Sequence, residues 1–154
     1  MRVHRFGVRF PRFAIAVLAA VASMLTVVGL VTWGGAPAQA APGQTAIVIG
    51  TGFGGLGMAI QLKKAGFDDI TIFEKAADVG GCWRDNTYPG AACDIPSRLY
   101  SYSFAPNPDW SHTYSGSAEI LSYIEGMVES TGVGAHIRFE HTVTGLEYDA
   151  DAGE

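Results

Sequence analysis

The sequence has few cysteines and, after its first forty residues, few basic side chains. Its two cysteines, Cys82 and Cys93, could form a disulfide if the protein is exported, but they stand eleven positions apart without nearby histidines, which argues against a zinc site. We predict two ordinary thiols, either buried or beside a cofactor. Four of the ten Lys and Arg residues lie within the first twelve positions, so six basic residues face all fifteen acidic ones in the remainder. This acidic balance argues against nucleic-acid binding.

Formal charge is absent from residues 14–33, which follow the four N-terminal arginines. Residues 38–40 read Ala-Gln-Ala, the small-residue pattern that signal peptidase cleaves, which predicts a signal peptide over 1–40 and a body over 41–154. A retained membrane anchor is the alternative, because about 20 apolar residues span a bilayer. We predict an exported or membrane-anchored protein, with a cytoplasmic location as the alternative.

Glycine is abundant where the body begins, with five glycines within eight residues from Gly50. They follow residues 46–49, an uninterrupted apolar run that predicts a wholly buried strand of a parallel sheet. Three of the glycines form a G-x-G-x-x-G pattern. In it Gly50 permits a tight turn, Gly52 lets backbone approach a pyrophosphate, and Gly55 lets a helix pack closely on the strand. Free amides at the helix N-terminus would then bind the anion.

A second apolar run, residues 70–74, ends in an acid nineteen positions after Gly55. A dinucleotide-binding fingerprint has a carboxylate at about this distance, where it binds the ribose hydroxyls. This order of a strand, a glycine-rich turn, a helix, a second strand and an acidic residue predicts a Rossmann-type α/β unit that binds a dinucleotide. The alternative is a glycine-rich turn without a ligand. Glu74 also argues against a 2′-phosphate at this site, since two anions would meet there.

Residues 75–116 sustain no helical or strand period, yet they are rich in aromatic rings. A loop of this length is usually functional or disordered, and its aromatic content argues against disorder. We predict that its rings serve a cofactor, and the alternative is that they cap the sheet. The rings are Trp83, Tyr88, Tyr100, Tyr102, Phe104, Trp110 and Tyr114.

Three further elements are expected to support this unit. Residues 117–131 have apolar side chains at helical spacing, which predicts an amphipathic helix capped by Ser117 and closed by Gly132. Residues 137–139 and 143–148 are predicted as strands. The histidines of the body show no ligand spacing, so no metal site is predicted.

Residues 50–104 resemble the N-terminal FAD-binding region of the class B flavoprotein monooxygenases, and most of all their Baeyer–Villiger branch. The specific part of the resemblance is the run GG-x-W-x-x-N-x-YPG-x-x-CD from Gly80 to Asp94. The likeness extends from residue 45 to about 149. That is about the first fifth of a typical family member.

The resemblance implies roles for individual residues. Five would surround the FAD pyrophosphate: Gly50, Gly52, Phe53, Gly54 and Gly55. Glu74 would hold the adenosine ribose, and the backbone of Val143 would meet the adenine. Four residues would follow the cofactor after the Gly80–Gly81 pair: Cys82, Trp83, Arg84 and Asp85. Asp94 and Tyr100 would lie near its flavin end, and the nicotinamide cofactor would be bordered by Ala92, Cys93 and Asp94. Cys82 departs from the family, which more often has Thr or Val there.

The resemblance also implies an enzyme in which NADPH reduces FAD and oxygen is then transferred to a ketone or a soft heteroatom. The family's second glycine motif, its signature sequence and its catalytic arginine would lie after Glu154. We therefore expect the FAD-binding portion of a longer enzyme, inactive alone, with its catalytic residues and substrate unassigned. An NAD-binding dehydrogenase-type domain and a non-catalytic FAD-binding remnant are the alternatives.

Overall fold

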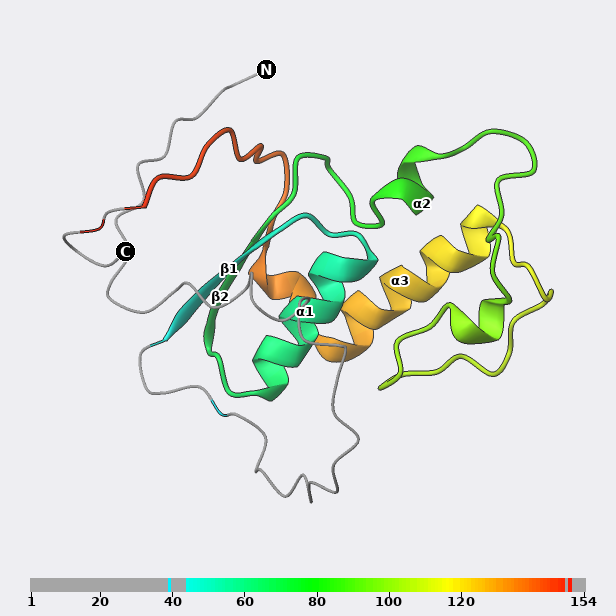
Figure 1. Cartoon of the computed structure of the whole chain (residues 1–154), viewed down its shortest axis with the longest axis horizontal. Coiled ribbons are helices and arrows are strands. Elements are labelled where there is room, and N and C mark those ends of the chain that lie inside the picture. Colours follow the sequence, from blue (N-terminus) through cyan, green and yellow to red (C-terminus); the bar gives the residue numbers. More distant parts are fainter. Residues whose placement is uncertain (1–38, 40–43, 149, 151–154) are drawn as a thin grey trace, which may run out of the picture.

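The computed structural model describes Gln39, residues 44–148 and Ala150. Within these residues the chain forms a three-stranded parallel sheet in the order β1 (Thr45–Ile49), β2 (Asp69–Phe73) and β3 (Ile137–Arg138). Helix α1 (Phe53–Lys64) joins β1 to β2, and helix α3 (Ser117–Thr131) lies beside α1 (Figure 1). The Rossmann-type α/β fold predicted from the sequence is confirmed for this part of the chain.

The β1–α1–β2 unit follows the predicted pattern closely. The two strands pair in parallel from Thr45 against Asp69 to Ile49 against Phe73. Helix α1 buries Leu56, Ala59 and Ile60 against them. The prediction that β1 is wholly buried is wrong, because Ile49 is 53% exposed: β1 pairs along only one edge among the described residues.

Helix α3 has the predicted bounds and ends as predicted. Its C-cap, Gly132, takes the left-handed conformation with φ of 65°, which suits a residue without a Cβ. The predicted N-cap is wrong: Gly116 is the N-cap and Ser117 is the first helical residue, with no side-chain cap. After α3, the 3₁₀-helix η2 (Val133–His136) leads into β3.

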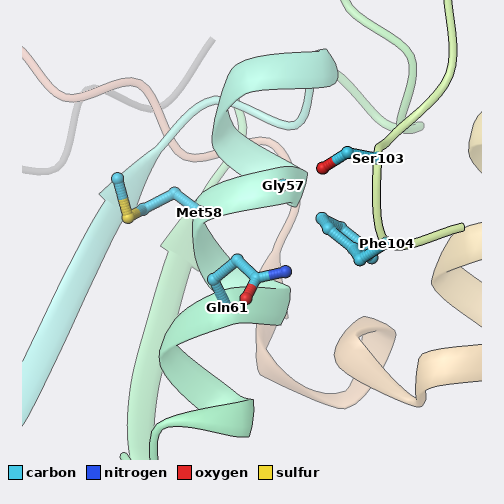
Figure 2. A pocket seen from close by; sticks show the side chains of 5 residues that line it. All are labelled: Gly57, Met58, Gln61, Ser103 and Phe104. Atoms are coloured by element: carbon cyan, nitrogen blue, oxygen red, sulfur yellow. The ribbon is translucent and has the colours of Figure 1, made fainter. Parts of the chain in front are cut away.

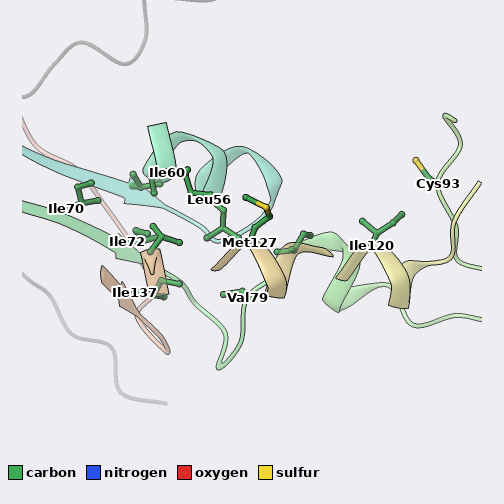
Figure 3. Close-up of a cluster of buried hydrophobic side chains, with 13 residues drawn as sticks. Leu56, Ile60, Ile70, Ile72, Val79, Cys93, Ile120, Met127 and Ile137 are labelled. Atoms are coloured by element: carbon green, nitrogen blue, oxygen red, sulfur yellow. The ribbon is translucent and has the colours of Figure 1, made fainter. Parts of the chain in front are cut away.

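A single apolar core joins the sheet to both helices (Figure 3). Ile72 of β2, Leu56 of α1 and Ile124 of α3 all belong to it and are fully buried. Val133 of η2 and Ile137 of β3 close the core at its other end. This core holds the ends of β1 and β2, where the glycines and Glu74 are, in fixed relation to α3.

The segment between β2 and α3 contains two short helices, α2 (Cys82–Asp85) and η1 (Ser97–Leu99). The one-turn helix α2 was not predicted, because four residues are too few to show a helical period. Five of the seven rings in this segment pack against the core: Trp83, Tyr100, Tyr102, Phe104 and Trp110. Tyr88 and Tyr114 are exposed.

The predicted strand over residues 143–148 is wrong, because this stretch has no regular secondary structure. A strand requires a neighbour that shares its ladder of hydrogen bonds, and none of the described segments supplies one. In the part of the chain that the structure describes, no helix has the length and apolarity needed to cross a membrane. The predicted signal or anchor segment lies outside the described residues, apart from Gln39.

Candidate functional site

The turn from β1 into α1 uses its three motif glycines for three different reasons. Gly50 has a φ of +92°, a conformation that side chains disfavour. A Cβ on Gly55 would lie 2.0 Å from the carbonyl oxygen of Gly50, so the helix could not pack as it does. Gly52, by contrast, has a φ of −74°, and the nearest atom to a Cβ there would be the Cα of Gly81 at 3.8 Å. The fold therefore requires glycine at 50 and 55 but leaves open space at 52.

The first turn of α1 presents amides that the helix does not use. The first amides of any α-helix have no carbonyl partner within it, and they carry the positive end of the helix dipole. Gly52 is the N-cap and has no side chain to bind them. The amide of Leu56 is the first to close a helical bond, to the carbonyl of Gly52 at 3.0 Å. The turn can therefore bind an anion beside Gly52.

Glu74 follows the last residue of β2, at the same edge of the sheet as the glycine turn. Its side chain is almost fully buried, and it accepts four hydrogen bonds or ion-pair contacts. Oε2 accepts from the Thr51 amide at 2.8 Å and from the Thr51 hydroxyl at 2.6 Å. Oε1 accepts from the Ala76 amide at 2.9 Å and lies 3.5 Å from the Arg84 guanidinium. The carboxylate thus holds the glycine turn and α2 together.

These contacts keep Glu74 ionised. Burial alone would raise the pKa of its carboxyl, but the hydrogen bonds from Thr51 and Ala76 and the charge of Arg84 together hold that pKa below its ordinary value of 4.5. A buried carboxylate is stable only when it is satisfied in this way. The site therefore has a fixed negative charge next to the amides of α1.

The Gly80–Gly81 pair brings α2 beside the glycine turn. The amide of Gly80 donates to the carbonyl of Thr51 at 3.1 Å, and a Cβ on Gly81 would lie 3.0 Å from the Cα of Gly52. From α2, Arg84 reaches Glu74 and also bonds Asp85 at 2.9 Å. The predicted residues Cys82, Trp83, Arg84 and Asp85 are therefore brought to the predicted pyrophosphate turn, although 30 positions separate the two segments.

Both cysteines are free thiols. Cys93 is buried, as expected of an ordinary core thiol, whereas Cys82 is exposed on α2. Cys82 is therefore not a buried thiol, and its place beside a cofactor stays a prediction. Among the described residues no cluster of His, Cys, Asp and Glu could hold a metal ion.

Tyr100 joins the first residue of α1 to α2. The Trp83 indole donates to its hydroxyl at 3.1 Å, and its ring lies edge-on to that of Phe53, with 4.9 Å between centroids. Burial raises the pKa of Tyr100, and the bond from Trp83 only partly offsets this. Three predicted site residues, Phe53, Trp83 and Tyr100, thus form one contiguous group.

The remaining predicted residues lie at the margin of this group. Ala92 pairs with Gly116 in an isolated bridge, so Ala92 and Asp94 are exposed while Cys93 between them is buried. Val143 is half-buried. The chain just before it runs alongside Glu74, because the His141 amide donates to the Glu74 carbonyl at 2.8 Å.

Thr51 has a role in this region that was not predicted from the sequence, and Tyr102 has a different role from the one predicted. Thr51 supplies two of the donors to Glu74, and a hydroxyl between two motif glycines was a usable signal for this. The hydroxyl of Tyr102 donates to the carbonyl of Phe53, 49 positions away in sequence, and no local sequence pattern predicts such a contact.

A cavity of about 490 Å³ lies on another face of α1, where Gly57, Met58 and Gln61 face Ser103 and Phe104 (Figure 2). Phe104 is the one ring of the loop that lines it, and none of the residues predicted individually to contact FAD or the nicotinamide cofactor does. It is an open depression next to the glycine turn, and the candidate site itself is the surface of the turn.

Comparison with known proteins supports this assignment. Residues 48–116 match the family described as an NAD(P)-binding Rossmann-like domain. A Baeyer–Villiger monooxygenase of Streptomyces coelicolor is 50% identical over 104 residues, which are 68% of this chain and 20% of the relative. The resemblance to the N-terminal region of the class B flavoprotein monooxygenases is confirmed.

Solved structures of this monooxygenase family agree. An oxidised steroid monooxygenase bound to NADP is 38% identical, with a TM-score of 0.59 over 62% of this chain and 19% of that one. OTEMO in complex with FAD and NADP is 32% identical, with a TM-score of 0.65 over 73% of this chain and 22% of that one. The chain thus spans about a fifth of the length of the monooxygenases it matches.

Proposed function

We propose that residues 41–154 are the FAD-binding portion of an NADPH-dependent flavoprotein monooxygenase. The observation that carries the proposal is the contrast between Gly52 and Gly55. A Cβ on Gly55 would clash with the carbonyl oxygen of Gly50, whereas a Cβ on Gly52 would meet only an ordinary contact. A pyrophosphate that touches the backbone explains why a glycine is nevertheless present there.

The residues around this space fit FAD. The amides of the first turn of α1 would bind the pyrophosphate at the positive end of the helix. Oε1 of Glu74 has only one amide donor at short range, so it is the oxygen with room for a ribose hydroxyl. Oε2 already accepts two bonds from Thr51, which would keep the carboxylate oriented toward the ribose.

When bound, the flavin would supply the redox and oxygen chemistry, and the protein would bind and orient it. Phe53, Trp83 and Tyr100 form a rigid aromatic group beside the pyrophosphate turn, and the exposed Asp94 lies farther along the same segment. We propose NADPH, oxygen and a ketone or heteroatom substrate as reactants of the longer enzyme. A membrane or exported location remains a prediction about residues 1–40.

The dehydrogenase-type alternative makes a different prediction for ligand preference. Titration of the full chain with FAD, followed by quenching of flavin fluorescence, should show tighter binding than a parallel titration with NAD followed calorimetrically. The reason is the Gly80 to Asp94 segment, which extends the site beyond what the glycine turn provides. Tighter binding of NAD than of FAD would overturn the proposal in favour of the dehydrogenase.

A further inference from the structure

We propose that Tyr102 is a positioning residue that fixes the first turn of α1, and with it the amides of the anion-binding turn. The inference rests on the proposed function for the identity of the ligand. Its structural basis is independent of that function: one side chain contacts two residues of α1, Phe53 and Gly57, which are one helical turn apart.

The first contact is a hydrogen bond at the start of the helix. The Tyr102 hydroxyl donates to the carbonyl oxygen of Phe53 at 2.7 Å. The two rings also touch, with 4.8 Å between their centroids. Because Phe53 is the first residue of α1 and follows Gly52 directly, this bond fixes the peptide group at the entrance to the anion-binding turn.

The second contact explains a glycine that the dinucleotide motif does not require. A Cβ on Gly57 would lie 2.8 Å from Cε1 of Tyr102, so the ring occupies the place of a side chain on α1. Glycine within a helix costs roughly 0.5 to 1 kcal/mol relative to alanine. The close approach of Tyr102 is the feature of the structure that accounts for Gly57.

Tyr102 is itself anchored to α3. Its amide donates to the Tyr123 hydroxyl at 2.9 Å, and that hydroxyl donates onward to the carbonyl of Ala105 at 2.8 Å. The Tyr123 ring also stacks on Phe53, with centroids 5.9 Å apart and planes 21° apart. The turn is thus connected to a helix that belongs to the core, and its position does not depend on the β1–α1 connection alone.

The hydroxyl of Tyr102 is a permanent donor. Burial, with the neighbouring Tyr123, raises the pKa of this phenol well above its ordinary value. The Tyr102 ring packs against α1 at Gly57. This differs from our expectation that the rings of this loop serve a cofactor. Its contribution to ligand binding is therefore indirect.

The test compares Tyr102→Phe with Tyr114→Phe in the full chain. Both variants lose a phenol hydroxyl, but Tyr114 is exposed and serves as the control. The ligands are ADP, which has a pyrophosphate, and adenosine, which has none, both titrated calorimetrically. Exchange of the Leu56 amide, which is hydrogen-bonded to the Gly52 carbonyl in the ligand-free chain, is a second readout, with β2 amides as the internal reference.

Tyr102→Phe should weaken ADP binding about fivefold, leave adenosine binding unchanged and speed exchange of the Leu56 amide about fivefold, as expected for one lost hydrogen bond. Tyr114→Phe should change none of these. Equal weakening of both ligands, or unchanged exchange, would overturn the positioning role. If the unaltered chain binds neither FAD nor ADP but exchange still rises in Tyr102→Phe, the proposed function fails and the positioning role stands.

Gly57→Ala provides a second variant if Tyr102→Phe does not fold. Its methyl group would displace the Tyr102 ring, so it should weaken ADP binding by a similar factor. Gly126→Ala is the matched control, because a Cβ there meets no atom within 4 Å. An ADP affinity of Gly57→Ala equal to that of Gly126→Ala would contradict the proposal.

Discussion

Gly52 is the motif glycine that the proposed function requires but the fold does not. A Cβ there would make only an ordinary contact with Gly81, and the backbone conformation is open to any residue. Gly52→Val should therefore fold like the unaltered chain and abolish FAD binding, since its side chain would occupy the space of the pyrophosphate. Circular dichroism and flavin fluorescence quenching check the two halves of this prediction. Normal FAD binding by the variant would show that the glycines form only a turn.

Thr51 and Glu74 form the other decisive pair at the residue scale. Thr51→Val preserves side-chain shape but removes the 2.6 Å hydroxyl bond to a carboxylate, so it should lower the free energy of unfolding by about 1.5 to 3 kcal/mol at neutral pH. Thr51→Ser keeps the hydroxyl and is the control. Urea unfolding measures both, and equal losses in the two variants would assign the effect to packing.

The depressed pKa of Glu74 gives this pair a defined pH dependence. Burial acts against the ionised form, but the Thr51 and Ala76 bonds and Arg84 outweigh it, so the folded pKa lies below 4.5. The resulting stability is fully present above the unfolded pKa and is lost as the pH falls through the folded value. In Thr51→Val the folded pKa should lie closer to the unfolded one, so the pH-dependent loss of stability should be smaller and should be complete at a higher pH. Melting temperatures from pH 7 to pH 3 test this, with Glu74→Gln as the variant that lacks the ionisation.

At the scale of elements, local patterns predicted β1 and β2 to within one residue, a helix between them, and α3 with its observed bounds. Each is defined by signals inside its own sequence: an apolar run, glycines at fixed spacing, or a helical stripe ending at Gly132. The candidate site was predictable to the same extent, because Gly50, Gly52, Gly55 and Glu74 obey a fixed spacing.

What could not be predicted depends on neighbours distant in sequence. Residues 143–148 alternate like a strand, but no described segment pairs with them. The exposure of Ile49 likewise depends on how many strands flank β1. The contact of Tyr102 with Phe53 and Gly57 joins segments nearly 50 positions apart and has no sequence period.

The two glycines of α3 allow a matched test of backbone conformation within one element. Gly132 has a φ of 65° and ends the helix, so Gly132→Ala should lower the free energy of unfolding by about 1 to 2 kcal/mol. Gly126 lies in the helix interior with open space around it, so Gly126→Ala should raise that free energy by about 0.5 to 1 kcal/mol. Urea unfolding measures both. The same sign for both changes would contradict the description of α3 and its C-cap.

For the whole molecule, size sets the limit on what these residues can do. The chain spans about a fifth of the monooxygenases it matches, and the described residues contain one glycine turn at the end of one βαβ unit. We assign that turn to FAD, and the ionised Glu74 beside it disfavours the phosphate that distinguishes NADPH. The described residues therefore offer no second site of this type for the reductant.

We predict that the 154-residue chain forms no ester from NADPH, oxygen and a ketone, even when it is supplied with FAD. Oxygen transfer by a flavin requires a pocket that excludes water, and several predicted site residues, among them Cys82, Ala92 and Asp94, are exposed. Any NADPH oxidation should therefore yield peroxide. Oxygen uptake measured together with peroxide and ester product tests this, with free FAD and no protein as the control. Ester formed in proportion to NADPH oxidised would show that these residues contain a complete monooxygenase site.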